Sequence, residues 1–271
     1  MSNLVTGQVT TASGVRISYQ IDGAEGAPWI VLSNSLATDR RVWDPQMEAL
    51  TKSRRVLRYD ARGHGQSGPG TPPYNLGLLA DDVVALMDHL GIETAEFMGI
   101  SLGGMTGLAL AIAHPKRVSK LICCDARADS PDAYKAIWDG NIARLHENGI
   151  SVLCEPTMER WFTAGFLADT ANSDTLTTVR SMINTTAAAG YEGAARALQN
   201  LDLLPNLPKI SCAVLYATGE FDMAAPVPVM QAMCDATPQA EFVVIEGAAH
   251  LSNLEQPDSF TKTVTAFLGL K

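Results

Sequence analysis

Short apolar runs alternate with longer amphipathic segments along most of the chain. The apolar runs have the length and composition of strands and occupy residues 8–11, 15–20, 29–32, 56–59, 95–98, 118–124, 213–217 and 241–245. Amphipathic periodicity predicts helices at residues 42–50, 76–90, 105–113, 228–235 and 257–267. Strands that alternate with helices in this way are typical of a mostly parallel sheet covered on both faces. We therefore expect an α/β protein built on an eight-stranded sheet.

The first two apolar runs differ from the others because they alternate in polarity and are separated only by Ala-Ser-Gly at residues 12–14. This pattern predicts an antiparallel hairpin at one edge of the sheet.

A helix-rich stretch interrupts the alternation after residue 125. Amphipathic segments follow one another without strands at residues 134–148, 155–162, 175–188 and 192–201. We interpret residues 126–208 as an inserted helical cap on an α/β core formed by residues 1–125 and 209–271, with Pro205 and Pro208 at the cap's exit. Ligands bind beyond the carboxyl ends of parallel strands, so such a cap would cover the site.

Composition narrows the class of protein. The 271-residue chain is 46% hydrophobic and carries a formal net charge of −9, and its basic runs are no longer than two residues. This acidity opposes nucleic acid as a partner. The first ten residues lack the basic and apolar regions of a signal peptide, and no stretch has the roughly 20 apolar residues of a membrane span. We expect a soluble, cytoplasmic protein without a membrane partner, and the sequence leaves open whether it forms a homo-oligomer.

Five cysteines, an odd number without a C-x-x-C pair, fit reduced core residues in a reducing compartment.

The strongest candidate for chemistry is Gly-Ile-Ser-Leu-Gly at residues 99–103, which places Ser101 between a predicted strand and a predicted helix. A sharp strand-to-helix turn strains the backbone and brings neighbouring chain close, so the positions of Gly99 and Gly103 must be nearly free of side chain. The following helix directs free N–H groups and a positive dipole end toward an oxyanion formed at the serine. This pattern is typical of a nucleophilic serine.

Two polar residues downstream can complete a catalytic triad. Asp222 follows the strand at 213–217 and His250 follows the strand at 241–245, both in predicted loops. A serine hydroxyl needs an imidazole to accept its proton, and the imidazole needs a carboxylate to fix its tautomer. We predict Ser101, Asp222 and His250 as this triad, although each partner taken alone also fits a helix cap or a structural loop histidine. Glu220 and Asp125 are rival acids.

An oxyanion hole requires a second backbone N–H besides that of Leu102. The loop after the strand at 29–32 is the natural donor, and the amide of Leu36 is our candidate. Ser35 is the alternative donor, and its hydroxyl is placed to touch substrate.

A G-x-G-x-x-G pattern at residues 63–68 also follows a strand, as in dinucleotide-binding proteins. Such a fingerprint must open a helix, whereas Pro69, Pro72 and Pro73 prevent one from starting before about residue 75. The sequence also has no Walker lysine and no H-E-x-x-H zinc motif. We therefore expect neither a cofactor nor a metal.

Six motifs in order along the chain resemble the 3-oxoadipate enol-lactonases of the α/β-hydrolase superfamily. They are SNSLATDRRVWDPQ, LRYDARGHGQSG, GISLGGM, ERWFTAGF, GEFD and AAHLSNLEQP, and the resemblance covers nearly the full chain. It implies an α/β-hydrolase fold and cofactor-free hydrolysis of a small lactone in bacterial aromatic catabolism. It also implies that Ser101 attacks, His250 acts as base and then acid, Asp222 orients it, and Leu36 and Leu102 hold the oxyanion.

One stretch, CCDARADSP at residues 123–131, departs from the more neutral sequence that the resemblance leads us to expect. Arg127 in this stretch either clamps a substrate carboxylate or pairs with Asp125 or Asp129.

Two cap tryptophans, Trp138 and Trp161, belong either to the core of the cap or to the wall of the pocket. The same triad also serves a general carboxylesterase, a cofactor-free perhydrolase or a C–C hydrolase. A ligand receptor of very low turnover is the alternative from another class of protein.

Overall fold

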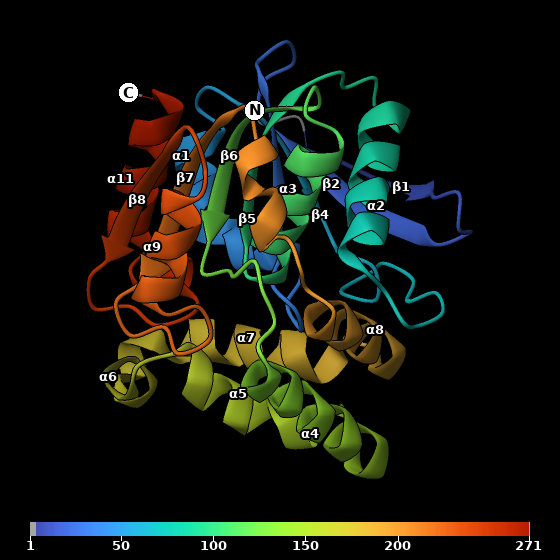
Figure 1. Ribbon diagram of the computed structural model, residues 1–271, viewed down its shortest axis with the longest axis vertical. Coiled ribbons are helices and arrows are strands. Elements are labelled where there is room, and N and C mark those ends of the chain that lie inside the picture. The colour runs from blue at the N-terminus through green and yellow to red at the C-terminus, as the bar shows by residue number, and fades with distance from the viewer. Residues whose placement is uncertain (1–3, 271) are drawn as a thin grey trace.

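The computed structural model describes residues 4–270 and has a central eight-stranded sheet (Figure 1). Its strands are β1 (Val5–Thr10), β2 (Arg16–Asp22), β3 (Trp29–Ser33), β4 (Arg55–Tyr59), β5 (Ala95–Ile100), β6 (Val118–Cys124), β7 (Ala213–Gly219) and β8 (Ala240–Ile245). They lie in the order β1-β2-β4-β3-β5-β6-β7-β8. The predicted mostly parallel sheet is confirmed, because every pair from β4 to β8 is parallel.

The β1–β2 hairpin is antiparallel and lies at one edge of the sheet, as predicted. β1 begins at Val5, earlier than the predicted residue 8, because its exposed residues pair through the backbone and leave little hydrophobic signal.

Helices cover both faces of the sheet (Figure 1). They are α1 (Asp44–Leu50), α2 (Leu76–His89), α3 (Leu102–Ala113), α9 (Val227–Asp235) and α11 (Pro257–Leu268), with the short α10 (Ser252–Glu255) between β8 and α11. α3 begins directly after Ser101, three residues before the predicted start at residue 105. Gly103 and Gly104 lie in its first turn, and glycine lowers helix propensity enough to hide that turn from the sequence pattern. No helix starts between residue 60 and α2, as the prolines after residue 68 predict.

Five helices between β6 and β7 gather beyond the carboxyl ends of the parallel strands (Figure 1). They are α4 (Asp132–Asn148), α5 (Cys154–Trp161), α6 (Ala164–Ala168), α7 (Ser173–Thr185) and α8 (Ala188–Gln199). The hydrophobic pattern did not predict α6, because this helix has only five residues and buries none of them. The chain enters and leaves this region side by side, because Asp129 and Asp202 form an isolated β-bridge. The boundaries of core and cap at 126 and 208 stay a prediction.

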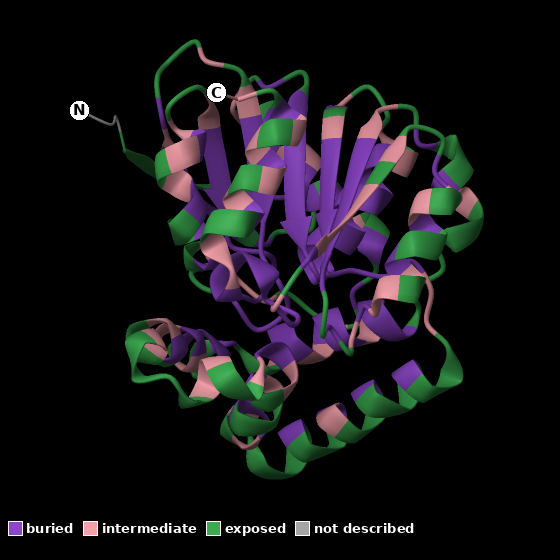
Figure 2. Cartoon of the chain, turned by 90° about the vertical axis from the view of Figure 1, so that its left-hand side faces the viewer, coloured by how far each residue is buried: buried purple, intermediate pink, exposed green. Residues whose placement is uncertain are grey.

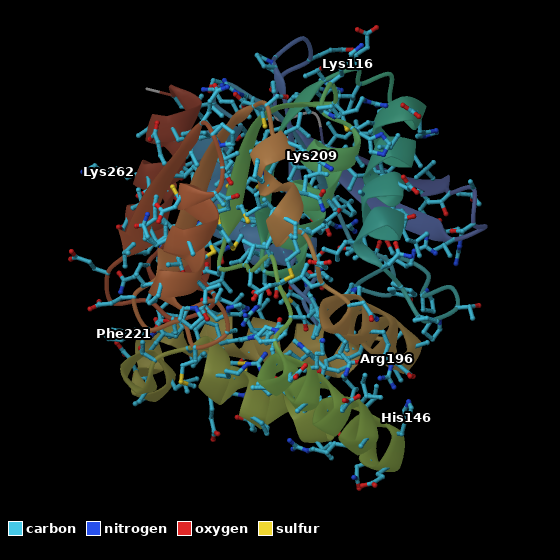
Figure 3. The ribbon with its side chains drawn as sticks, viewed as in Figure 1. Lys116, His146, Arg196, Lys209, Phe221 and Lys262 are labelled. Atoms are coloured by element: carbon cyan, nitrogen blue, oxygen red, sulfur yellow. The ribbon has the colours of Figure 1, made fainter. Side chains whose placement is uncertain are left out.

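α4 and α8 pack against each other. His146 Nε2 of α4 lies 2.8 Å from Glu192 Oε2 of α8, and this contact joins the two helices (Figure 3, where His146 is labelled).

The central strands are buried on both faces (Figure 2). β5 has no exposed residue, and Cys123 and Cys124 of β6 are fully buried free thiols, as core cysteines are expected to be. Burial raises the pKa of the Cys124 thiol well above its ordinary value, so this thiol stays protonated and unreactive. Within residues 4–270, no helix combines the length and apolar character that crossing a bilayer requires.

Candidate active site

Ser101 lies on a tight turn between β5 and α3. Its backbone has φ 54° and ψ −116°, a strained conformation for a residue with a side chain. A Cβ on Gly99 would lie 2.2 Å from the carbonyl carbon of Gly103, and a Cβ on Gly103 would lie 2.2 Å from the carbonyl oxygen of Ser33. Both glycines are therefore required by close backbone contacts.

The structure brings Ser101, His250 and Asp222 into one hydrogen-bonded chain. His250 Nε2 lies 3.0 Å from Ser101 Oγ, and His250 Nδ1 lies 2.8 Å from Asp222 Oδ2. The three residues come from loops after β5, β8 and β7 and are all less than 9% exposed. Asp222 Oδ1 accepts from the amides of Ala224 and Ala225, so the carboxylate is held at both oxygens. The arrangement can transfer a proton from the serine hydroxyl to the imidazole.

The two rival acids are occupied elsewhere. Asp125 Oδ1 accepts from the Gly219 amide at 2.8 Å, and Glu220 Oε2 accepts from the Gly247 amide at 2.9 Å. Burial, reinforced by the negative charge of Asp222, raises the pKa of Asp125 well above its ordinary value. Neither carboxylate hydrogen-bonds to His250, so the geometry favours Asp222 as its partner.

The two amides expected to hold an oxyanion occupy equivalent positions just after the neighbouring strands β3 and β5. Ser33 at the end of β3 pairs with Gly99 near the end of β5, and Leu36 and Leu102 each follow three residues later. Both residues are buried, and neither amide donates to an acceptor among residues 4–270. The Ser35 hydroxyl is also buried without a partner within those residues. Buried donors without acceptors are rare unless a ligand or an intermediate completes them.

A cavity of about 120 Å³ borders Leu36 and is also lined by Trp138 and Trp161 of the cap. The ring centroid of Trp161 lies 6.2 Å from that of His250. Both tryptophans are less than 5% exposed, so they pack in the cap and also form the wall of the pocket.

Arg127 does not line this cavity. Its Nη2 lies 2.9 Å from Asp129 Oδ1, its Nε donates to the Asp129 carbonyl oxygen, and its guanidinium carbon lies 4.5 Å from the ring centroid of Tyr134. The structure thus favours the pairing of Arg127 with Asp129 over the alternative of a carboxylate clamp.

Glu255, which no sequence motif singled out as a functional residue, holds the loop of His250. Its Oε2 accepts from the Ala249 amide at 2.8 Å, and its Oε1 accepts from the amide of Thr163 at 2.9 Å and from the Thr163 hydroxyl. Thr163 precedes α6, so this buried carboxylate links the cap helices to the residue before His250. The available signal was a single acidic residue in the mostly uncharged AAHLSNLEQP motif.

Comparison with known proteins identifies the family. Residues 28–257 match the model of the alpha/beta hydrolase fold family. The chain belongs to the α/β-hydrolase family. Among its relatives, 3-oxoadipate enol-lactonase 1 of Acinetobacter baylyi is 36% identical over 272 residues, which cover 99% of this chain and 98% of that protein. 3-Oxoadipate enol-lactonase 2 of the same organism is 34% identical over 258 residues, 95% of each chain.

A solved structure shows the same similarity in three dimensions. The crystal structure of the enol-lactonase from Burkholderia xenovorans LB400 matches this α/β hydrolase with a TM-score of 0.92 and 38% identity, over 97% of this chain and 100% of that one. The fold family expected from the six sequence motifs is confirmed.

Proposed function

We propose that this α/β hydrolase cleaves small carboxylic esters or lactones through an acyl-serine intermediate, with 3-oxoadipate enol-lactone as the preferred type of substrate. The hydrogen-bonded chain from Ser101 through His250 to Asp222 carries the proposal. The names of the relatives support the substrate class, because 3-oxoadipate enol-lactonases match the chain over nearly its full length.

Acylation begins with the serine hydroxyl. With Nδ1 protonated and donating to Asp222, His250 Nε2 accepts the proton of Ser101 Oγ as this oxygen attacks the ester carbonyl carbon. The carbonyl oxygen becomes an oxyanion, which the amides of Leu36 and Leu102 stabilise by hydrogen bonds in a buried site.

Collapse of this intermediate breaks the bond between the acyl carbon and the leaving oxygen. His250 returns its proton to that oxygen, and in an enol-lactone the enol formed by ring opening stays attached to the acyl group and converts to a ketone. Water then attacks the acyl-serine while His250 accepts a proton from it. This attack forms a second tetrahedral intermediate. When it collapses, His250 returns the proton to Ser101 Oγ and a carboxylic acid is released, so the enzyme is restored.

The decisive experiment combines active-site labelling with a substrate panel. A fluorophosphonate should add to Ser101, as detected by mass spectrometry. The Ser101→Ala variant should lose both the label and roughly 10⁴-fold or more in turnover of 3-oxoadipate enol-lactone and p-nitrophenyl acetate. Ser259→Ala, which removes an exposed hydroxyl of α11, is the matched control. Turnover of wild-type size in Ser101→Ala contradicts the mechanism.

The same panel addresses the alternative functions. Hydrogen peroxide with acetate tests perhydrolysis, and p-nitrophenyl esters test general esterase activity. Turnover below about one per minute on every substrate, far under the median for enzymes, would instead indicate a ligand receptor.

A further inference from the structure

The cavity of about 120 Å³ beside Leu36 and Trp161 has a single charged side chain among the described residues that line it, that of Arg160. The wall is otherwise largely apolar and aromatic, with Leu36 on the core side and Trp138, Trp161 and Tyr191 from the cap helices. Leu36 lies in the loop after β3, and its amide is the proposed oxyanion donor. Trp161 packs beside the ring of His250, so the cavity borders the place where an ester carbonyl would react. The position of Arg160 in the last turn of α5 therefore puts a cation within the same enclosure.

Arg160 differs from three other arginines of the cap region in having no acidic partner, and it differs from Arg144, which is exposed and donates to the Val152 carbonyl oxygen, in its partial burial. Arg127 pairs with Asp129, Arg180 with Glu155 and Arg196 with Asp139. Arg160 forms no ion pair within residues 4–270, and its Nε is buried without a hydrogen-bond acceptor there. Its guanidinium carbon lies 5.5 Å from the ring centroid of Trp138, which orients the group but accepts none of its hydrogen bonds.

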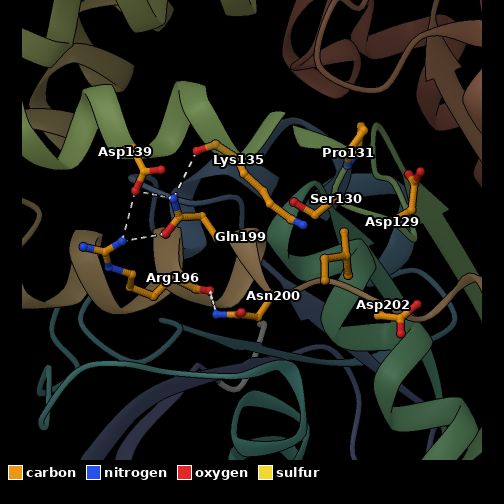
Figure 4. Close-up of a pocket in the computed structure, with 10 residues that line it drawn as sticks. Asp129, Ser130, Pro131, Lys135, Asp139, Arg196, Gln199, Asn200 and Asp202 are labelled. Atoms are coloured by element: carbon orange, nitrogen blue, oxygen red, sulfur yellow. Dashed lines mark hydrogen bonds and ion pairs between the residues drawn. The ribbon is translucent and has the colours of Figure 1, made fainter. Parts of the chain in front are cut away.

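A wider groove between α4 and α8 shows how the chain treats a cation that has only a structural role. This groove has a volume of about 730 Å³, and its Arg196 lies between Asp139 and Gln199, at 3.2 and 2.8 Å (Figure 4). The positive charge of Arg196 is therefore compensated within the protein. Arg160 lacks such compensation, and a partly buried guanidinium without an acceptor is costly unless a bound anion supplies one.

We propose that Arg160 binds a carboxylate carried by the substrate and so determines a preference for anionic lactones and esters. The proposal rests on the proposed function, because 3-oxoadipate enol-lactone carries a carboxylate on an arm of the ring. A guanidinium presents paired N–H donors in a planar fork that matches both oxygens of a carboxylate. The net charge of −9 makes this local cation more important, since the protein as a whole repels an anionic substrate.

Two pairs of probes separate this interaction from general catalysis. The lactone pair is 3-oxoadipate enol-lactone and its neutral counterpart, 5-methyl-2(3H)-furanone, which has the same enol-lactone ring without the carboxylate. The ester pair is p-nitrophenyl hydrogen succinate and neutral p-nitrophenyl butyrate. In the Arg160→Met variant, kcat/KM for the carboxylated member of each pair should fall about 30- to 300-fold, as expected when charged hydrogen bonds are lost. For the neutral member it should stay within about twofold, because the chemistry at Ser101 is unchanged.

Arg144→Met is the matched control, since Arg144 is an exposed arginine of α4 and its loss changes the net charge by the same amount. In Arg144→Met, the ratio of kcat/KM for the carboxylated probe to kcat/KM for the neutral probe should stay unchanged in both pairs. Fluorophosphonate labelling of Ser101 at the wild-type rate would show that Arg160→Met keeps an intact site. An equal loss on charged and neutral probes, or no loss on either, would overturn the role of Arg160.

The two proposals fail in different ways. If the wild-type protein hydrolyses the esters but neither lactone, the proposed lactone substrate is wrong, and the ester pair alone decides the role of Arg160. If Ser101 does not react with the fluorophosphonate and the wild type hydrolyses no probe, the acyl-serine mechanism and the role of Arg160 are both contradicted.

Discussion

Asp125 Oδ2 accepts a hydrogen bond of 2.5 Å from the hydroxyl of Ser252 inside the protein core. The other oxygen of Asp125 accepts from the amide of Gly219, at the start of the loop that carries Asp222. Ser252 itself follows His250 by two residues. One buried carboxyl group therefore holds together the two loops that bear Asp222 and His250, although its hydrogen bonds within residues 4–270 go to neither of those two side chains.

Removal of the Ser252 hydroxyl should loosen this connection. In Ser252→Ala the buried Asp125 carboxyl group loses this hydrogen-bond partner, so we expect the free energy of unfolding to fall by about 1–3 kcal/mol. The turnover number should also fall, because the loop of His250 loses an anchor. Urea unfolding and steady-state kinetics measure both effects. Ser259→Ala, at an exposed position of α11, should change neither, and an unaltered Ser252→Ala would contradict the anchoring role.

Asp125 should also make stability depend on pH. Burial raises its pKa in the folded protein above the ordinary value of 3.8, so the folded state keeps a proton that the unfolded chain releases. The stability contributed by this proton is complete below the unfolded pKa and is lost as the pH rises toward the folded pKa. Asp125→Asn cannot titrate. As the pH rises from 5, the free energy of unfolding of Asp125→Asn should therefore increase relative to that of the wild type, by at most about 1.4 kcal/mol per pH unit.

Urea unfolding of both proteins at several pH values between 5 and 8 checks this expectation. Asp235→Asn, which neutralises an exposed aspartate at the end of α9, is the control for a simple change of charge. A difference between Asp125→Asn and wild type that is the same at every pH would show that Asp125 does not take up a proton on folding.

The sequence was most informative about candidate catalytic residues that directly follow predicted strands. Asp222 and His250 each follow an apolar run, and parallel strands end at the same edge of a sheet, so their neighbourhood could be predicted from order alone. The start of α3 was predicted too late, because the glycines that permit the turn at Ser101 also weaken the helical pattern.

The partners of individual side chains could not be predicted in the same way. Arg127 and Arg160 are both arginines of the cap region. Only the folded geometry shows that Arg127 pairs with Asp129, whereas Arg160 borders the cavity without an acidic partner. Glu255 resembles an ordinary helix carboxylate in the sequence. Its role depends on Thr163, 92 residues away along the chain, and hydrophobic periodicity contains no information about such a long-range contact.

Glu255 should couple the cap helices to the site. In Glu255→Gln the side chain keeps its size, but its amide group must face either the Ala249 N–H or the Thr163 donors, so one donor loses its acceptor. We expect a loss of about 1–3 kcal/mol in the free energy of unfolding and a lower turnover number. Glu159→Gln, the same change at an exposed position of α5, should have neither effect. Chemical denaturation and kinetics with p-nitrophenyl acetate test the pair.

Gly103 offers the most direct test of the turn at Ser101. In Gly103→Ala the new methyl group would lie 2.2 Å from the Ser33 carbonyl oxygen, a backbone atom that cannot rotate away, so β3 and α3 must separate. Overpacking of this kind should lower the free energy of unfolding by about 1–3 kcal/mol. The loop after β3 carries the Leu36 amide, so its displacement should lower the turnover number about 10²-fold or more, as loss of an oxyanion donor does.

Gly140→Ala is the matched control for this change. A Cβ at Gly140 meets nothing within 4 Å, and the residue is exposed in the interior of α4. This substitution should raise the free energy of unfolding by about 0.5–1 kcal/mol through helix propensity and leave turnover unchanged. The opposite signs of the two glycine-to-alanine changes separate close packing at the turn from the intrinsic preference of the backbone. A Gly103→Ala variant with wild-type turnover would mean that the spacing of β3 and α3 does not position the oxyanion donors.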